Sequence, residues 1–287
     1  MDLGFAGSTA VVTGGSKGMG LAIAEVLGAE GASVAIMARG RTALKAAADR
    51  IRAAGAPEAL PIIVDMADAD SIATGFGAVR DAWGNLNVLV HTVGPAAGSF
   101  EELDDDDWYA AFDMGTMAAV RSVRAALPML RAAEWARIVT LSAHSIQRQS
   151  ARLVAYTATK AALSSFTKNL SKSLGPEGIL VNCVCPGTIV TASFTEILKD
   201  TLAAESLDSA DPHDVMTWVD RTYGHPCDIG RAGLPEKSPR PPPISRRAAT
   251  VTSRARPSTS TAARTSSEWV QPFFDISVAA VSAHFAW

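Results

Sequence analysis

A tyrosine and a lysine stand four residues apart in the segment YTATK, as Tyr156 and Lys160. Side chains four positions apart on a helix share one face. A free phenol has a pKa of about 10, and a nearby ammonium group favours the phenolate. Such a pair could exchange a proton with a carbonyl or an alcohol while a nicotinamide exchanges a hydride. The pattern alone is a weak signal, because it occurs by chance in many helices.

A glycine-rich loop near the amino terminus could bind phosphate. The segment TGGSKGMG places Gly14, Gly18 and Gly20 after a short apolar run and before a helical stretch. Glycines at these positions allow a tight turn, a close approach to a pyrophosphate and close helix packing, and the helix amino terminus favours an anion. A merely structural turn is the alternative. The position between strand and helix favours a dinucleotide site.

The end of the second apolar run, AIMARGR, bears on the choice of nucleotide. A ribose 2′-hydroxyl usually meets an acidic residue there, whereas a 2′-phosphate needs cations. Ala38 stands at the acidic position, Arg39 and Arg41 follow, and Lys17 lies within the glycine loop. This pattern favours NADP(H), with NAD(H) as the second option; the alternative is that the three cations are ordinary solvated charges. Asp65, in VDMAD, is placed to contact the adenine edge.

The elements that must position these groups alternate along the chain. Apolar runs with few polar residues are typical of parallel strands covered by helices on both sides. We expect strands at residues 9–13, 33–37, 60–64, 88–91, 137–141 and 180–184, with helices near 18–29, 41–54, 69–82, 105–131 and 153–174. The pattern predicts an α/β fold, a doubly wound (Rossmann) parallel sheet with helices on both faces.

The order of these motifs resembles the classical short-chain dehydrogenase/reductase family over roughly residues 5–236. The segments that carry the resemblance are TGGSKGMG, Asp65, HTVGP, YTATK, VNCVCPGTIVT and GRAGLPE. The resemblance implies an NAD(P)-dependent oxidoreductase that interconverts a carbonyl and a secondary alcohol. It makes Tyr156 the general acid/base, and Lys160 the residue that binds the nicotinamide ribose and lowers the tyrosine pKa. Further cofactor contacts are implied for Ser16, Met19, Met66, Gly94, Pro186, Gly187, Ile189 and Thr191.

Three departures from the family pattern concern catalysis. The family's Asn-Asn-Ala-Gly segment reads His-Thr-Val-Gly at 91–94, and Gly115 aligns with the asparagine of the proton relay. Ala143 stands 13 residues before the tyrosine, where the family's catalytic serine is common. We take Ser142 as the carbonyl donor, with Ser145, or neither, as alternatives. Loss of such a donor typically costs about 100- to 1000-fold in rate, so a nucleotide-binding protein with little or no turnover is the second hypothesis.

Other polar features have plainer interpretations. His91 and His144 could replace the missing donors, but core or solvated histidines are commoner. The acidic run at 104–107 is typical of a helix amino terminus rather than of a metal site. The segment 191–230 holds either an apolar lid over the substrate, as the resemblance suggests, or a helix pair that packs its own apolar face; the apolar residues concerned are Phe194, Ile197, Leu198, Met216, Trp218 and Tyr223.

Composition excludes several classes. The 287 residues contain no apolar stretch that would span a bilayer, and the start lacks the pattern of a signal peptide. Cys183, Cys185 and Cys227 are too few for a disulfide framework, so we expect a cytoplasmic protein. The partner is expected to be a small carbonyl or alcohol substrate, and not nucleic acid or a membrane. The resemblance also implies a homodimer or homotetramer.

Charge is unevenly distributed near the end of the chain. Residues 237–267 carry seven of the 26 Lys/Arg and none of the 29 Asp/Glu, although the net charge of the whole chain is −3. Regrouping the codons of Ser258–Ser266 by one nucleotide permits Ile-Asn-Val-Asp-Gly-Gly-Thr-Asp-Phe, which resembles the family's missing last strand and turn. We therefore predict a dinucleotide-binding domain at 1–236, and at 237–287 an aberrant, frameshifted and largely disordered segment. The last strand would then be missing or disrupted.

Overall fold

The computed structural model describes residues 3–234, apart from the side chain of residue 193. Six strands form one parallel sheet in the order β3-β2-β1-β4-β5-β6. Their bounds are β1 Thr9–Thr13, β2 Ser33–Ala38, β3 Ala59–Ile63, β4 Val88–His91, β5 Ala136–Leu141 and β6 Ile179–Val184. The predicted doubly wound sheet is confirmed. The predicted loss of the last strand concerns residues outside the described part of the chain.

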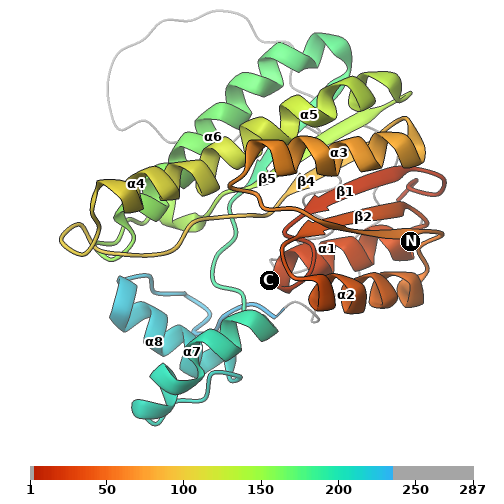
Figure 1. Ribbon diagram of the computed structural model, residues 1–287. Helices are drawn as coiled ribbons and strands as arrows, with labels where there is room; N and C mark the ends of the chain where they lie inside the picture. Colours follow the sequence, from red (N-terminus) through yellow and green to blue (C-terminus); the bar gives the residue numbers. More distant parts are fainter. Residues whose placement is uncertain (1–2, 235–287) are drawn as a thin grey trace, which may run out of the picture.

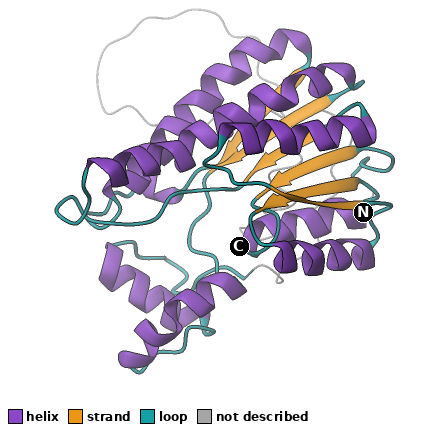
Figure 2. Ribbon diagram, viewed as in Figure 1, coloured by secondary structure: helices purple, strands orange, loops and turns teal. Residues whose placement is uncertain are grey.

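Helices cover both faces of the sheet (Figures 1 and 2). On one face lie α1 (Gly18–Ala29) and α2 (Arg41–Ala54), and on the other α3 (Ala69–Trp83), α5 (Ala118–Ala132) and α6 (Val154–Leu174). Each layer has its own apolar core. Val12, Ile36 and Val90 point toward α1 and α2, while Val11, Met37 and Leu89 point toward α3 and α5, because successive strand side chains alternate between faces.

The predicted helix at 105–131 is one continuous helical run with a change of winding in the middle. It begins as α4 (Asp105–Phe112), passes through a π-helical turn at Asp113–Met117 and continues as α5. The acidic run opens α4, with a capping box between Asp104 and Asp107. The interpretation of these acids as the opening of a helix is confirmed.

Two further helices, α7 (Ala192–Ala204) and α8 (Pro212–Tyr223), lie apart from the two helix layers, beyond the ends to which the strand arrows point (Figure 1). They share an apolar core of their own, made by Val190, Leu198, Leu202, Val215, Met216, Trp218, Val219 and Ala232. The interpretation of a self-packing helix pair therefore holds for most of this segment, although Ile197 is 76% exposed. No helix in residues 3–234 combines the length and the apolar character that crossing a bilayer requires.

Candidate active site

The carboxyl ends of β1 and β4 meet where the strand order reverses. Sheets of this kind bind ligands in the crevice at that point. The glycine loop leaves β1 there, and Gly14 donates from its backbone N–H to the Met37 carbonyl at 2.8 Å. Gly14 has φ of +72°, and a Cβ on Gly20 would lie 2.4 Å from the Gly14 carbonyl oxygen. The loop thus requires glycine at both positions.

The first turn of α1 is open to an anion. Gly18 begins the helix, and the preceding Lys17 makes no side-chain capping bond, so the first backbone N–H groups have no side-chain acceptor there. Lys17, Arg39 and Arg41 are all exposed near this end of the sheet. Ser16 and Met19 are half-buried in the same loop. This site would fit a dinucleotide whose ribose carries a phosphate. It combines a glycine-rich loop with the amino terminus of α1 and nearby cationic side chains.

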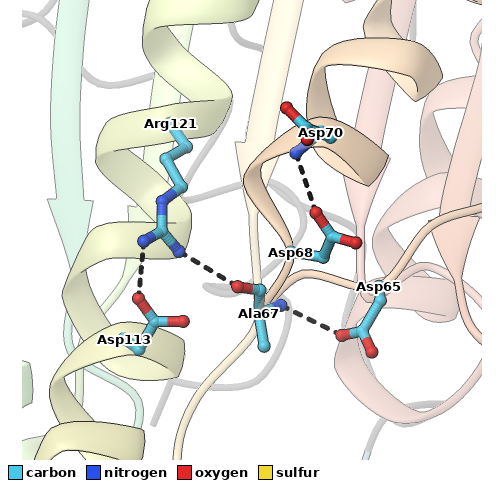
Figure 3. A network of polar contacts seen from close by, with 6 residues as sticks. All are labelled: Asp65, Ala67, Asp68, Asp70, Asp113 and Arg121. Carbon is cyan, nitrogen blue, oxygen red and sulfur yellow. Dashed lines mark hydrogen bonds and ion pairs between the residues drawn. The ribbon is translucent and has the colours of Figure 1, made fainter.

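The loop between β3 and α3 is held by a polar network (Figure 3). Ala67 N–H donates to the Asp65 carboxylate at 3.0 Å, and Asp68 caps α3 by accepting from Asp70 N–H at 2.8 Å. Arg121 of α5 donates to the Ala67 carbonyl at 3.2 Å and forms an ion pair of 2.7 Å with Asp113. One arginine therefore links the loop that carries Asp65 to the π-helical turn.

Met66 lies next to Asp65 but points elsewhere. Its side chain is 4% exposed and belongs to the core between the sheet and α3. Any contact with a cofactor would therefore come from its backbone.

Tyr156 and Lys160 lie on one face of α6, beside Gly94. A Cβ on Gly94 would stand 3.0 Å from Lys160 Nζ and 4.0 Å from Tyr156 Cε2. Lys160 Nζ donates to the carbonyls of Val93 (3.0 Å) and Leu141 (2.7 Å), at the ends of two neighbouring strands. The structure thus brings Gly94, which follows β4, together with Tyr156 and Lys160 on the distant helix α6.

Burial dominates the electrostatics of this pair. The Lys160 side chain is enclosed, and desolvation lowers its pKa to about 8. Burial also raises the pKa of the Tyr156 phenol. Burial of the phenol therefore opposes the expected effect of Lys160 on the tyrosine pKa, and the lowering of that pKa by Lys160 stays a prediction.

Ser142 does not have a free hydroxyl. Its Oγ donates to the Lys160 carbonyl at 2.8 Å and accepts from Ser164 Oγ, also at 2.8 Å. Ser142 therefore links α6 to the end of β5, and its role as donor to a substrate carbonyl stays a prediction. Ser145, in a short 3₁₀ turn, has a buried Oγ without a hydrogen-bond partner in the described part of the chain.

Two positions explain departures from the family pattern. His91 is fully buried, its Nδ1 lies 2.9 Å from Thr13 Oγ1, and burial lowers its pKa to about 3. It is thus a neutral core histidine, as the plainer interpretation held. A Cβ on Gly115 would lie 2.5 Å from Thr159 Oγ1. Thr159 therefore occupies the space that an asparagine side chain at position 115 would need.

The segment after β6 lies against the glycine loop. His144 N–H donates to the Pro186 carbonyl at 2.8 Å, and Thr191 Oγ1 is 3.5 Å from the position of a Cβ on Gly18. Thr191 also caps α7 by accepting from Phe194 N–H. Gly187 is exposed, and Ile189 is buried. These contacts place the start of the helix pair over the expected phosphate site.

Comparison with known proteins matches this arrangement to one family. A family model described as short chain dehydrogenase matches residues 8–202. The chain belongs to the short chain dehydrogenase family. This short chain dehydrogenase is 30% identical to the short-chain reductase protein NovJ of Streptomyces niveus over 251 residues, 87% of each chain. It is 31% identical to a short chain dehydrogenase of Pseudocercospora fijiensis, and that alignment covers 64% of this chain but only 60% of the fungal protein.

A solved structure gives the same result. L-sorbose reductase from Gluconobacter frateurii, complexed with NADPH and L-sorbose, superposes with a TM-score of 0.75 at 30% identity, over 82% of this chain and 88% of the reductase. Our short chain dehydrogenase is thus an oxidoreductase by family.

Ser164 and Thr159 were not singled out from the sequence. Their spacing from Lys160 and Tyr156 on one helix was the available signal, because residues three and four apart are neighbours.

Proposed function

We propose that this short chain dehydrogenase is an NADP(H)-dependent oxidoreductase that interconverts a carbonyl and a secondary alcohol. The observation that carries the proposal is the buried Lys160, held by the Val93 and Leu141 carbonyls beside Tyr156 and Gly94. The NADPH complex of L-sorbose reductase and the exposed cations Lys17, Arg39 and Arg41 support the choice of cofactor. NAD(H) is the second option.

The residues of the chain would divide the work as follows. The glycine loop and the first turn of α1 hold the pyrophosphate, Arg39 meets the ribose phosphate and Asp65 the adenine. A bound nicotinamide supplies or accepts the hydride. Tyr156 gives its phenolic proton to the carbonyl oxygen during reduction and removes it during oxidation. Lys160 binds the ribose, and its positive charge stabilises the phenolate that Tyr156 leaves.

Ser145 is our candidate for the donor that orients the carbonyl, since Ser142 is engaged with α6. A buried hydroxyl without a partner is unfavourable, and a substrate oxygen would satisfy it. We further propose that residues 1–236 form the domain and that it associates as a homodimer or homotetramer.

The test is NADPH oxidation with a broad panel of ketones, using Tyr156→Phe as the matched control. We expect turnover in the wild-type protein that falls by about 100-fold or more in the variant, because general acid–base catalysis contributes about that much. Equal rates in both proteins would refute the catalytic role.

A nucleotide-binding protein without turnover is the second candidate, favoured by Gly115 and Ala143. Saturable NADPH fluorescence with no oxidation of NADPH in the wild-type protein would select it.

A further inference from the structure

Arg121 of α5 bridges two segments that are far apart in the sequence (Figure 3). One terminal nitrogen, Nη1, donates to the Ala67 carbonyl at 3.2 Å, and the other, Nη2, lies 2.7 Å from a carboxylate oxygen of Asp113. The side chains of this ion pair are only 23% and 32% exposed, so salt and solvent screen their attraction incompletely. A guanidinium is planar and presents its N–H groups at fixed angles. The contact therefore fixes how the two segments lie relative to one another.

The first segment is the loop that is expected to meet the adenine. Ala67 N–H donates to the Asp65 carboxylate at 3.0 Å, and Asp68 N–H donates to the Asp65 carbonyl at 3.2 Å. Arg121 binds the carbonyl of the same alanine. Ala67 is thus held through both of its backbone polar groups, one bound to Asp65 and the other to Arg121. A shift of the arginine would move the carboxylate that the cofactor is expected to contact.

The second segment is the π-helical turn at Asp113–Met117, which contacts the helix that carries Tyr156. Thr116 Oγ1 donates to the Thr159 carbonyl at 3.0 Å, and a Cβ on Gly115 would lie 2.5 Å from Thr159 Oγ1. Thr159 Oγ1 in turn donates to the Tyr156 carbonyl at 2.9 Å. Turns of this kind are rare and occur frequently at functional sites. The place of the turn therefore bears directly on the place of the tyrosine.

Charge gives the arginine a second reason to be at this junction. Figure 3 shows the carboxylates of Asp65, Asp68 and Asp70 on the loop side of the guanidinium and that of Asp113 on the other side. Like charges repel, and a positive charge between them offsets the repulsion. A neutral side chain at position 121 would remove both the two contacts and this compensation, so the loop and the turn would move apart.

We propose that Arg121, together with Asp113, is a positioning residue of the reaction, because it holds the loop that carries Asp65 at a fixed place relative to the helix that carries Tyr156. A dinucleotide has its adenine at one end and its nicotinamide at the other. When the adenine is held by the loop, the nicotinamide meets the tyrosine correctly only if the two ends of the site keep their spacing. A misplacement of about 1 Å can cost about 100-fold in rate. The proposal rests on the proposed function, since it assumes that a dinucleotide spans these residues.

Hydrogen exchange measured by mass spectrometry tests the link without turnover. The probe is adenosine 2′,5′-bisphosphate, the half of NADPH that would contact the loop but not Tyr156. In the wild-type protein we expect the saturating probe to slow exchange several-fold in peptides that cover 113–117, and in Arg121→Gln we expect no such slowing. Unchanged exchange in the wild-type protein despite binding, or equal slowing in both proteins, would overturn the proposal and leave the proposed function standing. If neither the probe nor NADPH bound, the proposed function itself would be refuted, and the proposal with it.

A matched control comes from the same helix. Arg131→Gln removes another arginine–carboxylate pair of α5, the contact of 2.6 Å with Glu177, and its turn should respond to the probe as in the wild-type protein. Asp113→Asn keeps the shape of the side chain and the bond between Arg121 and Ala67, so it serves if Arg121→Gln folds poorly. It should reduce the slowing by the probe. Full slowing in Asp113→Asn would contradict the role of the ion pair.

Kinetics separates positioning from a general loss of structure. We expect Arg121→Gln to lower kcat with NADPH by about 10- to 100-fold. The Kd of adenosine 2′,5′-bisphosphate should change little, because the loop can still bind its own half of the cofactor. An unchanged kcat, or a Kd that weakens by the same factor as kcat falls, would overturn the positioning role. No turnover in the wild-type protein would refute the proposed catalysis and, with it, a positioning role in that catalysis.

Discussion

Replacing Gly115 by alanine tests why this position has no side chain. The new Cβ would lie 2.5 Å from Thr159 Oγ1 and 2.7 Å from Thr159 Cβ, about an ångström inside ordinary contact. Thr159 is 0% exposed, and its Oγ1 donates to the Tyr156 carbonyl, so it has little freedom to move away. Overpacking of this kind costs about 1 to 3 kcal/mol. For a chain of this size that corresponds to a fall in Tm of about 2 to 4 °C per kcal/mol.

A double-mutant cycle separates this contact from a general intolerance of the π-helical turn. Thr159→Ala alone should cost about 1 kcal/mol for the lost hydrogen bond and methyl group. The double variant Gly115→Ala/Thr159→Ala should lose less stability than the two single variants lose when added together. The expected difference, the coupling energy, is about 0.5 to 3 kcal/mol. Thermal and urea unfolding would measure each variant.

The matched control is Gly77→Ala in α3, where a Cβ would meet only Arg80 Nη2, at 3.8 Å. That change should stabilise the protein by about 0.5 to 1 kcal/mol, because alanine restricts the unfolded chain more than glycine does. Strictly additive effects of Gly115→Ala and Thr159→Ala would show that Thr159 is not the reason why position 115 has no side chain. That result would refute the steric explanation.

Four further outcomes are expected. Ser145→Ala should lower kcat by about 100-fold, whereas Ser142→Ala should mainly lower the free energy of unfolding by about 1 kcal/mol; the reverse pattern would return the donor role to Ser142. Arg39→Gln should weaken NADPH about tenfold by fluorescence titration and leave NADH unchanged, while Arg50→Gln, which loses only its pairing with Glu25, should change neither. Since the pKa of His91 falls to about 3 in the fold, the unfolded chain binds the extra proton first, and stability is lost as pH falls from about 6.5 toward 3. Urea unfolding at several pH values should show that the free energy of unfolding of His91→Asn depends less on pH than that of the wild-type protein. The expected difference in slope is about 1.4 kcal/mol per pH unit. Sequencing the gene across the codons for Leu234 to Ser238 should reveal one inserted or missing base, and an intact frame would remove the frameshift explanation.

The sheet and the cofactor loop could be predicted because their signals are local. Strands such as Thr9–Thr13 and Val88–His91 agree with the sequence to the residue, since apolar runs between turn residues define them without tertiary information. Predicted and observed bounds elsewhere differ by one residue, as at Ala136 and Ile179. The glycine loop could also be predicted, because its tight turn and the close packing of the helix themselves require glycine at these positions.

What the sequence did not reveal depends on contacts between distant segments. The π-helical turn at Asp113–Met117 is accompanied by the approach of Gly115 to Thr159, which no local pattern records. Ser142 was chosen as a donor because it stands beside the expected position, but only the fold directs its proton to the Lys160 carbonyl. The raised pKa of Tyr156 also arises from burial, which spacing along a helix does not measure.

The attachment of Lys160 affects how an inactive form of this enzyme should be made. Its ammonium joins the chain just after β4 to the last residue of β5, so Lys160→Ala would leave the Val93 and Leu141 carbonyls without their donor. Each unsatisfied buried acceptor costs about 1 to 3 kcal/mol. In a Lys160 variant, a loss of activity caused by the missing catalytic group could not be separated from one caused by loosening of the strand ends. A substrate-trapping or crystallographic form of the protein is better built on Tyr156→Phe, which leaves this junction of two strands and a helix in place.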